Sequence, residues 1–138
     1  MKFIVGADED RAVVQIIAEH LRSLGHQVEL LPVGTWGVVA TAVGQAVAGG
    51  SADQGVVCCW TGTGVTMAAN KVRGVRAALC ADAQTASGAR KWNDANVLGL
   101  SLRTLSEPVA KEILDAWLGG VYSGSEDESL AVLRRSEG

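Results

Sequence analysis

The amino-acid sequence predicts an α/β protein, with a five-stranded parallel, Rossmann-like sheet lying between two layers of helices. Two observations predict this three-layer α/β/α sandwich. Short apolar runs alternate with segments of helical periodicity along the chain, and the connections between them are short. Most of the apolar runs are also apolar throughout, rather than at every second residue, which is typical of strands covered on both faces.

The expected elements follow in order, beginning with a strand at 2–6 and a helix whose apolar stripe ends before Gly25. Asp8 or Asp10 is the expected cap of that helix, Asp82 is the expected cap of a later one, and a Ser-Glu-Pro start at 106–108 opens another. We expect a single domain over 1–138, because this length supports one hydrophobic core. The other expected strands are 26–31, 54–59, 75–80 and 95–101, and the other expected helices are 38–49, 65–72, 83–92, 106–118 and 126–135.

Composition argues against several classes of protein. A net charge of −3 without any basic run predicts no binding to nucleic acid. No apolar stretch approaches the roughly 20 residues of a membrane span, so we expect no membrane partner. Three cysteines, two of them adjacent, make a poor disulfide framework, which predicts a reducing, cytoplasmic setting. The chain has no CxxC pair, so we expect no metal and no cofactor.

Ligands of such folds bind outside the carboxyl ends of the strands, and the richest of these ends is CWTGTG at 59–64. The Gly-Thr-Gly turn opens a helix, so its N–H groups and the helix dipole favour an anion. It matches neither GxxxxGK[ST] nor GxGxxG. From these residues alone, an anion site and a simple strand-to-helix turn remain equally good interpretations.

Cys59 closes the strand beside that helix N-terminus, a position that favours a thiolate able to act as base or nucleophile. From these residues alone, however, a buried core cysteine is the favoured interpretation, as it is for Cys58 and Cys80. His20 and His26 have no clear catalytic position, which argues against a Cys-His hydrolase. Before the last expected strand, KWNDAN offers Asn93 for binding a polyol, or simply a turn at a helix end. Trp92 either stacks on a sugar or covers the core.

The stretches CWTGTGVTMAANKVRGVRAALC and ARKWNDANVLGL resemble the ribose-5-phosphate isomerase B family, which includes the galactose-6-phosphate isomerase subunits. The resemblance extends from KFIVGADE to DAWLGGVY. It implies an aldose–ketose isomerase of carbohydrate metabolism that acts on a sugar phosphate, such as the pentose phosphate ribose 5-phosphate. The implied reaction passes through an enediolate and needs no metal. It also implies a homodimer or homotetramer whose active sites lie at the dimer interface.

The resemblance further implies residue roles: a cysteine base, backbone N–H groups that hold the enediolate oxygen, and polar side chains that bind the sugar and its phosphate. Asp8 matches a contact to sugar hydroxyls, Asn93 a contact to the reacting end, and Arg103 a phosphate contact. The predicted site comprises Cys59 and Thr61 as catalytic residues, Gly62, Thr63 and Gly64 as the oxyanion turn, and Asp8, Glu9, Trp92, Asn93 and Arg103 as substrate-binding residues.

The sequence departs from the family pattern where phosphate binds. Glu9 and Trp92 stand where the family often has histidine, and 123–128 is acidic where relatives carry arginine. The loop after 34–36 is shorter and lacks an Asp-Tyr-Pro that reaches the substrate. Three functions therefore remain open: a sugar-phosphate isomerase, a non-catalytic or complementary subunit of a hetero-oligomer, and an isomerase of a non-phosphorylated or amino sugar.

Overall fold

The computed structural model describes residues 1–137, in which five parallel strands form one sheet in the order β2-β1-β3-β5-β4. The strands are β1 (Lys2–Ala7), β2 (Gln27–Leu30), β3 (Gln54–Cys59), β4 (Ala77–Leu79) and β5 (Val97–Ser101). The helices are α1 (Ala12–Ser23), α2 (Trp36–Ala48), α3 (Thr63–Asn70), α4 (Ala83–Asn93), α5 (Glu107–Leu118) and α6 (Asp127–Ser136).

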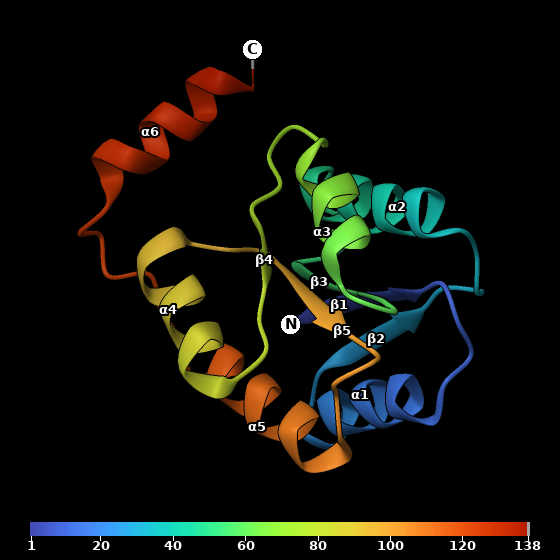
Figure 1. The fold of residues 1–138 in the computed structure, drawn as a ribbon. Helices are drawn as coiled ribbons and strands as arrows, with labels where there is room; N and C mark the ends of the chain where they lie inside the picture. The colour runs from blue at the N-terminus through green and yellow to red at the C-terminus, as the bar shows by residue number, and fades with distance from the viewer. Residues whose placement is uncertain (138) are drawn as a thin grey trace.

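Helices cover both faces of the sheet, as Figure 1 shows. One hydrophobic core joins the sheet to α1, α4 and α5, and a second joins it to α2 and α3. The strands β3 and β5 lie in the middle of the sheet and are buried almost throughout, which explains their unbroken apolar runs. The predicted three-layer α/β/α sandwich is therefore confirmed.

The helix α6 lies apart from both helical layers, at the end of an extended segment that runs past α4 (Figure 1). Leu130 is the one residue of α6 that is buried, whereas Val132 and Leu133 are about half exposed. Glu137 accepts a 2.6 Å hydrogen bond from the N–H of Gly74, which ties the end of the helix to the loop before β4. Within residues 1–137, no helix is long and apolar enough to cross a membrane.

The strand order places a topological switch point between β1 and β3. The chain crosses from β1 to β2 on one side and later adds β3 on the other side of β1. The two strands run parallel with Ala7 opposite Cys58, and the N–H of Asp8 donates to the carbonyl of Cys58 at 3.2 Å. Ligands of doubly wound sheets bind at such a point, beyond the carboxyl ends of the strands.

Some local predictions need correction. No side chain caps α1, because Asp8 and Asp10 precede its N-cap residue Arg11 and lie too early to serve. The helix predicted at 65–72 begins at Thr63, because Gly62 adopts a left-handed conformation and lets the helix start there. The predicted cap Asp82 is confirmed, since it accepts from the N–H of Thr85; Ser106, expected as the first helical residue, instead caps α5 and accepts from the N–H of Val109.

Candidate active site

The segment after β3 carries the candidate catalytic cysteine. Cys59 is the last residue of β3 and is 5% exposed, at the carboxyl edge of the sheet. Gly62 then turns the chain with φ +75°, and α3 begins at Thr63. The first N–H groups of a helix have no partner within it, and no side chain caps α3. This turn therefore presents free donors and the positive end of a helix dipole next to Cys59.

Only glycine fits at the start of this turn. A Cβ on Gly62 would lie 2.8 Å from the carbonyl carbon of Leu100 and 2.6 Å from the Leu79 side chain. The hydroxyls of Thr61 and Thr63 are hydrogen-bonded to each other at 2.7 Å, and both residues are exposed. The four predicted residues Thr61 to Gly64 thus form one compact turn with two hydroxyls at its mouth.

The three cysteines differ in environment. Side chains alternate along a strand, so Cys58 enters the core beneath α1, α4 and α5, and Cys59 enters the one beneath α2 and α3. Burial raises the pKa of the Cys58 thiol to about 12, and burial together with Asp82 raises the pKa of Cys80 to about 11. Neither is a thiolate at neutral pH, which leaves Cys59 as the candidate base.

Asp8 has a carboxylate oxygen that is prepared for a ligand. Its Oδ1 atom is buried and has no hydrogen-bond partner among residues 1–137, although the side chain as a whole is partly exposed. Burial, and then the charge of Glu9, raise the pKa of Asp8 above its usual value. An unpaired buried oxygen is costly, which makes Asp8 Oδ1 a candidate acceptor for a ligand at this edge.

Glu9 belongs to a charge cluster that sequence reasoning missed. Its carboxylate pairs with Arg11, whose Nε lies 2.7 Å from Oε2. The Arg11 guanidinium in turn lies over the Trp60 ring, 4.8 Å from its centroid. Arg103 follows β5, and its N–H donates to the Trp60 carbonyl at 2.9 Å. The sequence does place Arg11 after the first strand and directly before a helix, and this position was the one indication that Arg11 lies at the same edge of the sheet.

A second tryptophan forms a wall of the same edge. Trp36 opens α2 after the loop that follows β2, and its side chain is about half exposed. Its ring packs on Gly64, where a Cβ would lie 3.0 Å from the nearest ring carbon. In this way Trp36, the first residue of α2, reaches the start of α3.

Two predicted residues lie elsewhere. Asn93 ends α4 and Trp92 precedes it, so both lie on the amino side of β5. The five residues of Val97–Ser101 separate the ends of β5 by about 13 Å. A single chain therefore does not bring Asn93 to the Cys59 turn. The Trp92 ring packs over Gly88 and is half exposed.

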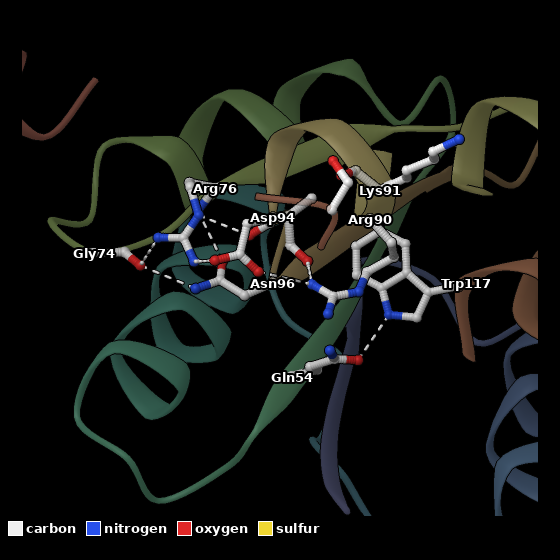
Figure 2. A network of polar contacts seen from close by, with 10 residues as sticks. Gln54, Gly74, Arg76, Arg90, Lys91, Asp94, Asn96 and Trp117 are labelled. Carbon is white, nitrogen blue, oxygen red and sulfur yellow. Dashed lines mark hydrogen bonds and ion pairs between the residues drawn. The ribbon is translucent and has the colours of Figure 1, made fainter. Parts of the chain in front are cut away.

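Asn93 lines a cavity of about 580 Å³ at the amino end of the sheet. The end of α3 forms one side of this cavity with Asn70 and Lys71, and α6 forms another with Leu133. Next to Asn93, Asp94 joins the polar network drawn in Figure 2. Within residues 1–137, no group of three or more histidine, cysteine, aspartate or glutamate side chains is arranged to hold a metal ion.

The chain is similar to known sugar isomerases along most of its length. A family model described as Ribose/Galactose Isomerase matches residues 3–132. Ribose-5-phosphate isomerase B of Escherichia coli (strain K12) is 40% identical over 119 residues, which cover 81% of this chain and 78% of that protein. The galactose-6-phosphate isomerase subunit LacB of Clostridium acetobutylicum is 37% identical over 118 residues, which cover 80% and 67%.

Solved structures agree with this similarity. Ribose-5-phosphate isomerase B of Clostridium thermocellum superposes with a TM-score of 0.95 at 32% identity, covering 99% of this chain and 97% of the other. The enzyme of Mycoplasma genitalium with bound ribulose 5-phosphate gives 0.92 at 32% identity, covering 99% and 95%.

A parallel sheet with a cysteine and an uncapped helix N-terminus at its switch point is the arrangement expected of an α/β enzyme. The chain belongs to the ribose/galactose isomerase family. The resemblance carried by CWTGTGVTMAANK and KWNDAN is thereby confirmed, and with it the enzyme class, aldose–ketose isomerase.

Proposed function

We propose that this protein interconverts the aldose and ketose forms of a sugar phosphate close to ribose 5-phosphate, with Cys59 as the base. The thiolate takes the proton from the carbon next to the carbonyl, and the electrons of that C–H bond form the carbon–carbon double bond of an enediolate. A proton then passes from the adjacent substrate hydroxyl to the former carbonyl oxygen, and the Cys59 thiol returns its proton to the former carbonyl carbon, so that the carbonyl re-forms on the neighbouring carbon and the thiolate is regenerated. The observation that carries this proposal is the position of Cys59 beside the uncapped N-terminus of α3.

The turn Gly62–Thr63–Gly64 holds the developing negative oxygen in this scheme. Its N–H groups precede or begin α3 and are fixed before reaction, so they stabilise charge without reorganising. The Thr61 hydroxyl, bonded to that of Thr63, stands next to the same oxygen. Asp8 accepts a sugar hydroxyl with its unpaired Oδ1.

Two guanidinium groups bind the phosphate in this proposal. Arg103 follows β5, and Arg11 lies over Trp60, so both belong to the edge that carries Cys59. Arg11 neutralises Glu9, so this edge is less acidic than its sequence suggests. Arginine suits the task because its planar N–H groups match phosphate oxygens in pairs.

A second copy of the chain completes each site. The short helix α3 has the oxyanion turn at its N-terminus, and its C-terminal residue Asn70 lines the cavity of Asn93. Met67 on α3 is 64% exposed, and a second copy packed against α3 would cover this apolar side chain. Two copies packed with α3 antiparallel across a two-fold axis bring Asn93 of one chain to the Cys59 turn of the other.

Hydrogen exchange into substrate tests the chemistry. The purified protein is incubated with ribose 5-phosphate, other sugar phosphates and their free sugars in deuterated water. We expect deuterium at the carbon next to the carbonyl, and a loss of at least a hundredfold in exchange for Cys59→Ala. Cys58→Ala is the matched control, because it removes the neighbouring thiol yet should lower only stability.

Several outcomes would contradict the proposal. Exchange that survives in Cys59→Ala would remove the cysteine base. Exchange with free sugars but not with their phosphates would favour the non-phosphorylated substrate instead. An inactive purified chain that gains activity from a homologous subunit would favour the complementary subunit.

A further inference from the structure

Asp94 is the only non-glycine residue with a positive φ, 47°, among residues 1–137. It directly follows Asn93 and ends α4, where its own N–H and that of Ala95 both donate to the carbonyl of Ala89. This closure resembles the usual end of a helix, at which glycine is the preferred residue. A side chain at this backbone conformation is uncommon and persists where its surroundings hold it.

Two arginines clamp the Asp94 side chain. Arg76, before β4, places Nη2 at 3.4 Å from Oδ2, and Arg90, on α4, places Nη1 at 3.4 Å from Oδ1. Figure 2 shows the carboxylate between the two guanidinium groups. The arginine side chains are only 24% and 14% exposed, so these are not loose surface pairs.

The same arginines also fix the backbone on either side of the clamp. The Nε of Arg76 donates to the Asp94 carbonyl at 2.7 Å, and Arg90 donates to the carbonyl of Ala95. Asn96 accepts from the N–H of Arg76 at 2.7 Å and donates to the Gly74 carbonyl at 3.0 Å. The junction between α4 and β5 is therefore tied to the loop before β4 at several points (Figure 2).

The turn itself does not need this arrangement. Glycine adopts a positive φ without strain, so a glycine at 94 would end α4 just as well. It would need no carboxylate held between two arginines that are partly removed from solvent. Asn93, next to the clamp, is exposed and lines the cavity at the amino end of the sheet. What the clamp adds over glycine is a fixed direction for the end of α4, where helices otherwise fray.

We propose that Asp94, held by Arg76 and Arg90, is a positioning residue that fixes Asn93 for the isomerase reaction. This inference rests on the proposed function, in which Asn93 contacts the reacting end of a sugar bound at the other chain's Cys59 turn. A reacting group that is displaced by about 1 Å loses on the order of a hundredfold in rate, so a fixed Asn93 matters for kcat.

A double-mutant cycle tests the coupling. Asp94→Gly keeps the turn and removes the clamp, so we expect kcat to fall about tenfold or more with KM changed less than about threefold. In the Asn93→Ala background the same change should alter kcat less than about twofold, because nothing remains to be positioned. Asp94→Asn, which keeps an acceptor and tolerates this conformation, should retain more kcat than Asp94→Gly.

The matched control lies at the other end of the same helix. Asp82→Ala removes the N-cap of α4 and lowers its stability, but it leaves the clamp intact, so kcat should not change. Effects of Asp94→Gly and Asn93→Ala that simply multiply would overturn the proposal. So would an equal loss of kcat in Asp82→Ala.

A readout independent of activity separates this inference from the proposed function. The side-chain amide of Asn93 can be followed by ¹⁵N relaxation in the full chain. It should be as ordered as the backbone in the wild type and clearly mobile in Asp94→Gly. If the Asn93 side chain is equally ordered in Asp94→Gly, the positioning role of Asp94 is refuted even if the enzyme is active. Full activity of Asn93→Ala would instead refute the role given to Asn93 in the proposed function.

Discussion

Asp8 shows how a single residue is prepared for a ligand at the expense of stability. Because burial and Glu9 raise its pKa above 3.8, the folded state binds this proton more tightly than the unfolded chain does. Stability is therefore lost as the pH rises from about 4 through the folded-state pKa. The buried, unpaired Oδ1 adds to the cost until a donor binds.

Asp8→Asn should accordingly raise the melting temperature at pH 7, with a gain that shrinks as the pH falls through the raised folded-state pKa towards 3.8. The same variant should lower kcat/KM, because an amide is a weaker acceptor for a sugar hydroxyl than a carboxylate. Thermal unfolding at several pH values and steady-state kinetics measure the two effects. A melting temperature that falls at pH 7 would contradict the prediction.

Arg11 and Glu9 allow a prediction with two opposite signs. Arg11→Ala should raise KM for a phosphorylated sugar about tenfold, since one charge-assisted contact to phosphate is lost. Glu9→Gln should lower that KM, because it removes a negative charge and frees Arg11 from its 2.7 Å pair. KM should be measured at fixed ionic strength. Arg22→Ala, at the far end of α1, is the control and should leave KM unchanged. If Arg11→Ala and Glu9→Gln shift KM in the same direction, a phosphate site here is contradicted.

At the scale of the element, the entry into α3 depends on Gly62. Gly62→Ala should lower the free energy of unfolding by about 2–4 kcal/mol, from the positive φ together with the 2.8 Å approach to the Leu100 backbone. Gly124→Ala is the control, because its φ of +78° is similar but no atom lies within 4 Å of the added Cβ. It should lower the free energy of unfolding by only about 1 kcal/mol. Chemical denaturation measures the free energy of unfolding of both variants. Equal losses of stability would show that the close approach of residue 62 to the Leu100 backbone plays no part.

The elements also show how far sequence reasoning reaches. Apolar runs predicted every strand, and β3 has the predicted bounds, because a buried parallel strand is apolar from end to end. The start of α3 was missed by two residues, since a local sequence does not reveal that Gly62 turns left-handed. The cap predicted for α1 was wrong because the chain after β1 first continues along the sheet edge, where Asp8 bonds to Cys58.

The candidate site was predicted less completely than the fold. Strand ends identify Cys59, the turn and Asp8, because parallel strands end at a common edge. The stacking of Arg11 on Trp60 depends on how two loops from distant parts of the sequence meet, and no local pattern contains that information. In the same way, the motif around Asn93 indicates a polar group but not that β5 separates it from Cys59.

At the scale of the whole molecule, the separation of Asn93 from the turn makes a mixing experiment decisive. Cys59→Ala and Asn93→Ala should each keep only a small residual activity alone, yet regain much more when they are unfolded and refolded together. Random pairing makes half of the dimers mixed, and each mixed dimer has one complete site, so roughly a quarter of wild-type activity is expected. No recovery from a mixture shown to contain mixed dimers would refute the shared site.

The two ends of α3 have a further consequence for how the enzyme behaves in a test tube. If each site takes one end of α3 from each of two chains, as proposed above, an isolated subunit should be inactive and turnover per chain should depend on protein concentration. Specific activity should fall on dilution below the dissociation constant of the dimer and recover on concentration. Specific activity would then report directly on dimer formation. An excess of an inactive variant would inhibit the wild-type chain by pairing with it in mixed dimers.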